Sequence, residues 1–131
     1  MIPRVNLITL AVADIAASRA FYERLGWKAG KASNPSVAFF NLNGGVLSLY
    51  GREALAGDTG VSGAKPGSVT LAINLESREA VDAAMTEAKS AGAAILTQPK
   101  DMPWGYVGYF SDPDGHPWEM AFVPSFPMGG D

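Results

Sequence analysis

Apolar residues recur at two spacings along the chain, and the same succession of spacings appears in each half. The pentapeptides Ile8–Val12 (ITLAV) and Val69–Ile73 (VTLAI) are nearly identical and stand 61 residues apart. Their β-branched and apolar side chains are typical of strands in a buried sheet. We therefore interpret the chain as an internal repeat in which each pentapeptide begins one module.

A helix is predicted directly after each of these strands. Asp14 can cap a first helix that runs to about Leu25, with Gly26 placed to end it in a left-handed conformation. Ser77 is the expected cap of a second helix, which Gly92 ends. Apolar residues fall on one stripe of each helix, so each helix is expected to cover one face of a sheet.

The spacing changes to that of extended chain after each helix. Each half predicts one strand, at 27–32 or 93–98, and then a hairpin, which turns at 43–44 or 112–115. The hairpin strands are expected at 37–42, 46–50, 106–111 and 118–123. Each half thus predicts the order strand–helix–strand–strand–strand. Module one covers about 1–50, a surface linker 51–67, module two 68–123, and a frayed tail 124–131.

Composition narrows the class of protein. A chain of 131 residues, 47% apolar and 18% charged, predicts one soluble domain with a substantial core. The net charge of −3 and ten scattered basic residues argue against nucleic acid or an anionic membrane as partner. The chain has no cysteine, which excludes disulfides and thiolate chemistry. No signal peptide or membrane-spanning run is visible, so a cytoplasmic location is expected.

Three segments resemble, in order, parts of the vicinal oxygen chelate superfamily, which includes glyoxalase I, bleomycin-resistance proteins and extradiol dioxygenases. The segments are VADIAASRAFYERLGW (12–27), SVTLAINLESREAVDAAMTEAKSAGA (68–93) and GYFSDPDGHPWEM (108–120). The resemblance covers nearly the whole chain. It implies an α+β fold, a single domain over 1–131 in which two βαβββ modules with curled mixed sheets form a cleft.

The resemblance also implies four metal-ligand positions, on the first and last strands of the two modules. They fall on Leu7, Ser48, Ser68 and Glu119, of which Glu119 alone has a ligating side chain. The one histidine, His116, is expected in a turn, and the site of non-heme iron oxygenases needs two. We therefore expect no metal and no other cofactor.

Glu119 is the candidate catalytic residue. A carboxylate held in a cleft is suited to hold or shuttle a proton. The alternative is an ordinary carboxylate that is paired with an arginine or hydrogen-bonded by a hydroxyl, such as that of Ser48 or Ser68. Perturbed acids in clefts indicate function only statistically, so both interpretations stay open.

Aromatic residues supply the other candidate site. The segment 104–110 (WGYVGYF) holds four aromatic rings and two glycines. Such clusters line apolar pockets and stack flat ligands, although they also pack cores. Core packing is favoured for Phe39, Phe40 and Phe110. The expected ligand-binding residues are Leu7, Ser48, Tyr50, Ser68, Thr70, Trp104 and Tyr106.

Two functions are consistent with these features. One is a metal-independent protein that binds a small apolar or aromatic molecule, as the bleomycin-resistance branch does. The other is a glyoxalase-like lyase, isomerase or hydrolase with Glu119 as acid and base. The missing metal ligands favour the first. A homodimer is expected in either case, because the family's modules usually pair and thirteen aromatic residues need covering.

Overall fold

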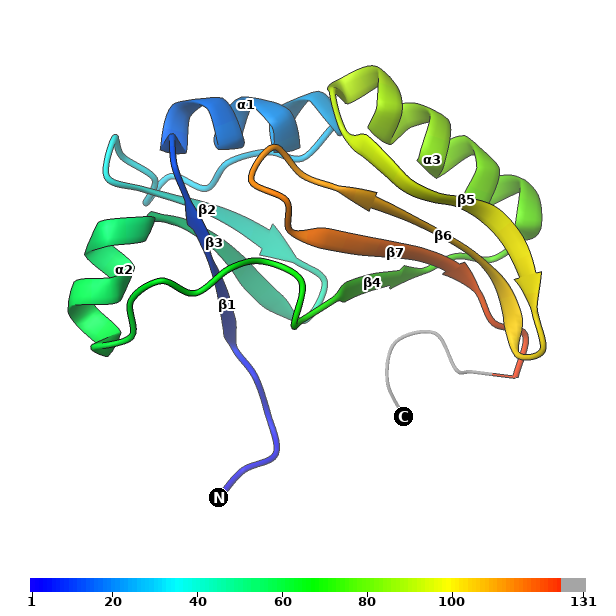
Figure 1. Ribbon diagram of the computed structural model, residues 1–131, viewed down its shortest axis with the longest axis horizontal. Helices are drawn as coiled ribbons and strands as arrows, with labels where there is room; N and C mark the ends of the chain where they lie inside the picture. The colour runs from blue at the N-terminus through cyan, green and yellow to red at the C-terminus, as the bar shows by residue number, and fades with distance from the viewer. Residues whose placement is uncertain (126–131) are drawn as a thin grey trace. The chain divides into compact units, whose positions relative to one another are not determined.

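The computed structural model describes residues 1–125 and divides into two compact units, which meet in sequence between Lys65 and Pro66. The first unit contains β1 (Leu7–Val12), α1 (Ile15–Arg24), β2 (Val37–Leu42), β3 (Gly45–Gly51) and α2 (Arg52–Thr59) (Figure 1). The second contains β4 (Leu71–Asn74), α3 (Arg78–Ala91), β5 (Ala94–Met102), β6 (Gly105–Ser111) and β7 (Pro117–Phe122). Most of the tail expected to fray, 126–131, lies outside the described residues.

The two units share one pattern of strand pairing. The sheet of the first unit has the order β1-β3-β2, and that of the second has the order β4-β7-β6-β5. In each, the first strand runs parallel to the last, and the remaining pairs are antiparallel. Parallel strands need a long crossover connection, and each unit makes part of it with a helix that follows its first strand. The expected α+β fold of two related modules is confirmed.

Both predicted crossover helices begin and end as expected. The Asp14 carboxylate accepts a hydrogen bond from the backbone N–H of Ala17, at 3.0 Å. The Ser77 hydroxyl accepts one from Ala80, also at 3.0 Å. Each helix is followed by a glycine with φ near +100°, at 91° for Gly26 and 108° for Gly92. A side chain at either position would be strained in this left-handed conformation.

The strand predicted over 27–32 is wrong. This segment makes only an isolated bridge between Ala29 and Phe40, with the N–H of Gly30 bonded to the carbonyl of Phe39 at 2.7 Å. The corresponding segment of the second unit forms the nine-residue strand β5. Residues 27–35 (WKAGKASNP) contain Gly30 and Pro35 and few β-branched side chains, so they have little propensity to extend the sheet.

A helix, α2, occupies part of the segment predicted as a surface linker. The five glycines and the proline of 51–67 suggested an irregular connection. However, between Gly51 and Gly60 the sequence REALAGDT has one glycine and several strong helix formers. Gly60 ends the helix in a left-handed conformation with φ of 79°. No helix within residues 1–125 is both long and apolar enough to cross a membrane.

Each crossover helix covers one face of its own sheet. In the first unit Phe21 and Tyr22 of α1 are fully buried, and Tyr22 lies 5.8 Å from Phe40 of β2 between ring centroids. In the second unit, α3 buries an apolar stripe against β5, β6 and β7. Phe110 and Trp118 are buried there with stacked rings, so the expected core role is confirmed for Phe40 and Phe110. Phe39 is only half-buried, so its expected core role is not confirmed.

Substitution of two glycines, Gly105 at the start of β6 and Gly57 within α2, tests how closely the chain packs around each of them. We expect Gly105→Ala to destabilise the protein by about 1–3 kcal/mol, because an added Cβ would overlap the backbone carbonyl of Phe122, which cannot move cheaply. Gly57→Ala should instead stabilise it by roughly 0.5–1 kcal/mol, since a Cβ inside α2 meets no atom within 4 Å. Urea denaturation measures both free energies of unfolding. Equal effects of the two substitutions would contradict this packing.

Candidate functional site

Glu119 lies near the middle of β7, with Tyr109 of β6 opposite it on one side and Ala72 of β4 on the other. Its neighbours Trp118 and Met120 are buried on the face that α3 covers. Successive side chains of a strand point to opposite faces. Glu119 therefore lies on the face of this sheet that α3 leaves uncovered.

Tyr109 is hydrogen-bonded to this carboxylate. The phenolic O–H donates to Oε1 of Glu119 at 2.5 Å, and the contact is partly buried. This hydrogen bond, followed by burial and the negative charge of Glu119, raises the pKa of Tyr109 to about 12. All three favour the neutral phenol. Tyr109 therefore keeps its proton at neutral pH and holds one carboxylate oxygen in place. We call these two residues the Glu–Tyr pair.

Tyr109 was not among the predicted site residues. The carboxylate was expected to have a hydroxyl partner in Ser48 or Ser68 as one alternative, and the structure gives it the hydroxyl of Tyr109 instead. Tyr109 could have been found by pairing the residues on either side of the predicted turn at 112–115. The strand pairing places Ser111 opposite Pro117, and two residues further along each strand Tyr109 meets Glu119.

Two expected residues of the first unit lie on its central strand, β3. Ser48 is buried and its hydroxyl accepts a hydrogen bond from Thr9 of β1, at 3.3 Å. Tyr50 is half-buried and stands opposite Ala11 and Val37. The third, Leu7, begins β1 and is 49% exposed. A hydroxyl and an alkyl side chain occupy two of the implied ligand positions.

Ser68 and Thr70 lie ahead of β4 and are exposed. A strand was expected from Val69, and this start is wrong, because β4 begins at Leu71, opposite Trp118. One residue earlier the chain would meet Pro117, which has no N–H to donate to a ladder. Ser68 therefore falls outside the sheet.

The donor set does not fit a metal ion. Within residues 1–125, no group of three or more His, Cys, Asp or Glu side chains is placed to hold one. The predicted turn position of His116 is confirmed, since it precedes β7 and its backbone N–H donates to the Asp112 carboxylate at 2.9 Å. The same carboxylate accepts a hydrogen bond from the N–H of Asp114 at 3.0 Å, so Asp112 stabilises the turn before β7.

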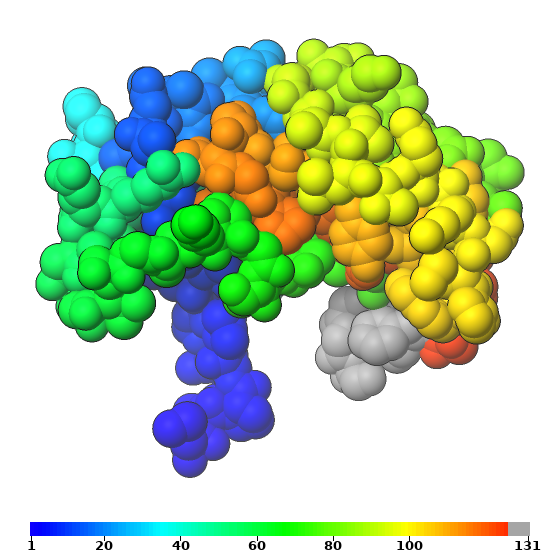
Figure 2. Space-filling view, viewed as in Figure 1, coloured from blue at the N-terminus to red at the C-terminus, as the bar shows by residue number. Residues whose placement is uncertain are grey.

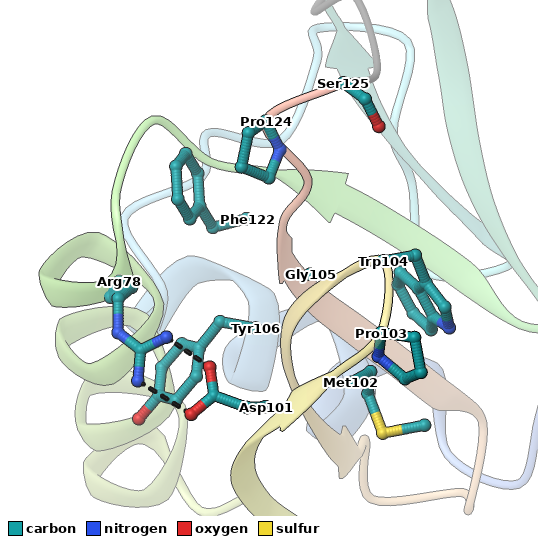
Figure 3. Close-up of a pocket in the computed structure, with 10 residues that line it drawn as sticks. All are labelled: Arg78, Asp101, Met102, Pro103, Trp104, Gly105, Tyr106, Phe122, Pro124 and Ser125. Carbon is teal, nitrogen blue, oxygen red and sulfur yellow. Dashed lines mark hydrogen bonds and ion pairs between the residues drawn. The ribbon is translucent and has the colours of Figure 1, made fainter.

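Trp104 and Tyr106 line a groove at the tip of the β5–β6 hairpin (Figure 3). Its volume is about 330 Å³, and Trp104 is 45% exposed. We call it the hairpin groove. It is lined by Arg78, Asp101, Met102, Pro103, Trp104, Gly105, Tyr106, Phe122, Pro124 and Ser125. An exposed indole of this kind can stack on a flat ligand.

Charged side chains attach this hairpin to α3. The Arg78 guanidinium makes two hydrogen bonds to the Asp101 carboxylate and lies over the ring of Tyr106, 4.2 Å from its centroid. The Tyr106 hydroxyl donates to Asp82 at 2.7 Å. The hydrogen bond to Asp82 raises the pKa of Tyr106, and that from Arg78 lowers the pKa of Asp101. These contacts hold the side chains of Arg78, Asp101 and Tyr106, which line the groove, in place before a ligand binds.

The structure does not bring Trp104 and Glu119 into one site. Tyr106 and Tyr109 are three residues apart on β6, so they point to opposite faces. Trp104 precedes Tyr109 by five residues, which corresponds to roughly 16 Å of extended chain. Within the second unit, the two candidate sites therefore form two separate surfaces: the Glu–Tyr pair and the hairpin groove.

Comparison with known families gives one broad match. The model of the Glyoxalase/Bleomycin resistance protein/Dioxygenase superfamily matches residues 4–120. No curated protein matches the sequence.

Solved structures extend this similarity. A glyoxalase-related enzyme from Fulvimarina pelagi is 38% identical, with a TM-score of 0.90, over 99% of this chain and 95% of that one. A glyoxalase/bleomycin resistance protein/dioxygenase from Nocardioides is 28% identical, with a TM-score of 0.79, over 100% and 90%. A lactoylglutathione lyase from Agrobacterium tumefaciens is 17% identical, with a TM-score of 0.71 over 92% and 93%, and shares the fold alone.

The Glu–Tyr pair predicts a titration that depends on Glu119. In the wild type Tyr109 should lose its proton near pH 12, as followed by the NMR signal of its phenolic carbon. In Glu119→Gln the pKa should fall towards the ordinary value of 10.0, because the hydrogen bond to a carboxylate and the negative charge of that carboxylate are both lost. Tyr106, which is bonded to Asp82, should titrate alike in both proteins. If Tyr109 titrates alike in both as well, the pair does not form.

Proposed function

Because the chain belongs to the glyoxalase/bleomycin resistance protein/dioxygenase superfamily, we propose that it binds a small apolar or aromatic molecule without a metal ion. One observation carries the proposal. The single carboxylate at the positions that would bind a metal is held by a phenol, and the other three positions carry Leu7, Ser48 and Ser68. A catalytic metal site needs several His or carboxylate ligands.

The Glu–Tyr pair can orient a ligand. Tyr109 holds Oε1 of Glu119, which leaves Oε2 to accept a hydrogen bond from a hydroxyl or amine of the bound molecule. The hydrogen bond from Tyr109 also keeps the carboxylate in one rotamer. Less side-chain freedom is then lost when the ligand binds.

The hairpin groove offers a different contact. The exposed indole of Trp104 can stack on a flat ring, and Phe122 and Pro103 supply further apolar surface. A groove of about 330 Å³ is at the small end of the range for ligand sites, roughly 300–1,000 Å³. The groove favours a small flat aromatic molecule, whereas the Glu–Tyr pair favours a molecule that carries a hydrogen-bond donor.

The second candidate function is a glyoxalase-type lyase or isomerase. It is favoured by the Fulvimarina pelagi structure, which is 38% identical and described as a glyoxalase-related enzyme. Oε2 of Glu119 would remove a proton from the substrate carbon and return it elsewhere, while the Tyr109 hydrogen bond holds the carboxylate in position. Tyr109 itself would transfer no proton, because its pKa is about 12.

Metal content gives the first test. Protein purified without chelator should contain no stoichiometric zinc, nickel or iron, because alkyl and hydroxyl side chains replace three ligands. Native mass spectrometry with elemental analysis measures the metal, the subunit number and any retained ligand together. One tightly bound transition metal per subunit that is lost in Glu119→Gln would overturn the proposal.

Two substitutions separate the surfaces and the functions. If the ligand stacks in the hairpin groove, Trp104→Ala should weaken binding by on the order of 1–3 kcal/mol, while Trp104→Phe weakens it less. If it binds at the Glu–Tyr pair, Glu119→Gln should weaken binding instead. Should Glu119 transfer a proton during turnover, Glu119→Gln would slow the reaction roughly a hundredfold while binding persists.

The ligand for these measurements comes from NMR screening of small aromatic compounds against the full chain. Glu76→Gln removes an exposed carboxylate from the same unit and serves as the matched control for charge. Thermal melts show whether each variant is folded. Unchanged binding and activity in folded Trp104→Ala and Glu119→Gln would place the ligand on neither surface.

A further inference from the structure

The first unit contains a cavity that the Glu–Tyr pair and the hairpin groove do not explain. It has a volume of about 380 Å³ and lies between β1, α2 and the segment after α2. We call it the α2 cavity. It is lined by Ala11, Arg52, Leu55, Ala56, Thr59, Val61, Gly63 and Ala64. All of these residues belong to the unit that ends at Lys65.

The strand alternation of β1 explains where the cavity forms. Leu10 and Val12 are buried on the side that α1 covers, so Ala11 between them points to the other side. α2 follows β3 directly and packs against β1 and β3. Its side chains therefore approach the sheet from the side of Ala11. The small methyl group of Ala11 leaves space beneath the helix.

The apolar face of α2 is incompletely covered. No residue of α2 is buried, whereas α1 and α3 each bury several side chains. Leu55 and Ala56 are half-buried at the cavity, and Val61 beside them is 62% exposed. Figure 2 shows α2 and the green segment that follows it at the surface. A small apolar molecule in the α2 cavity would remove this area from water.

The charge of the lining selects the ligand. Among the residues 1–125 that the structure describes, Arg52 alone is charged and lines the cavity, and the two carboxylates of α2, Glu53 and Asp58, do not line it. A guanidinium binds a carboxylate through two parallel hydrogen bonds, which are stronger than bonds between neutral groups. The hydroxyl of Thr59 adds one polar group, and it accepts a hydrogen bond from the N–H of Val61 at 3.1 Å.

We infer that the α2 cavity binds a small apolar monocarboxylate. Its ring or branched chain lies against Leu55, Ala56 and Val61, and its carboxylate pairs with Arg52. This site requires a negative charge on its ligand, whereas Glu119 requires a hydrogen-bond donor. The inference is therefore independent of the proposed function, and substitutions at other residues test it.

Three compounds of nearly equal shape test it: benzoate, benzamide and benzamidine. Titration of the full chain, followed by amide NMR, should shift the signals of Ala11, Leu55 and Gly63 on addition of benzoate. Benzoate should bind about tenfold more tightly than neutral benzamide, and cationic benzamidine should bind least. Equal binding of benzoate and benzamide, no binding of benzoate, or shifts confined to other residues would overturn the inference.

Variants separate the two contacts. Arg52→Gln should reduce benzoate affinity to that of benzamide, and Lys31→Gln, which removes an exposed cation that does not line the cavity, should not. Leu55→Trp should fill the cavity and weaken the binding of both benzoate and benzamide. If thermal melts show that this variant does not fold, Ala56→Leu is used in its place. Unchanged benzoate binding in Arg52→Gln, or equal weakening in Trp104→Ala, would contradict the assignment.

Discussion

The parallel pairing of the first and last strands in each unit is the constraint on which the rest of the structure depends. Because parallel neighbours cannot be joined by a tight turn, a helix crosses one face of each sheet. The same pairing places β3 and β7 in the interior of their sheets, each between two neighbouring strands. Ser48 and Glu119 therefore have a partner strand on both sides, and the crossover helix does not cover them.

This position explains how polar side chains at the implied ligand positions find partners within the sheet. On β3 the buried hydroxyl of Ser48 bonds to Thr9, the residue opposite it on β1. On β7 the carboxylate of Glu119 bonds to Tyr109, the residue opposite it on β6. In both units a directly opposed hydroxyl satisfies the side chain that the family resemblance places at a ligand position. Cross-strand pairs of this kind form wherever the pleat brings two polar groups together.

Much of the fold could be predicted from the sequence because the two halves repeat. The caps at Asp14 and Ser77 and the turn at 112–115 act locally, so their residues suffice to identify them. The predicted strand at 27–32 was wrong because extended spacing alone does not reveal that Gly30 and Pro35 limit pairing. α2 was missed since glycines at its ends resemble those of a loop. The start of β4 depends on Pro117, a residue that is distant in sequence.

The candidate site was less predictable, because it depends on strand register. Glu119 was found from a motif, but its partner Tyr109 follows only from pairing Ser111 with Pro117. Trp104 and Tyr106 were found from an aromatic segment that lies close to Glu119 in sequence. Alternation along β6 places Tyr106 on the α3 side, where Arg78 and Asp82 contact it. Residues that are close in sequence therefore lie on two surfaces that the pleat separates.

The central claim is that Glu119 is bound by Tyr109 and does not ligate a metal. Paramagnetic broadening by added Mn²⁺ or Ni²⁺, read from the side-chain carboxyl signal of Glu119, tests it most directly. We expect Glu119 to broaden no more than exposed carboxylates such as Glu76 at equal metal concentration. Selective loss of the Glu119 signal at one equivalent of metal, together with release of the Tyr109 hydroxyl, would contradict the account.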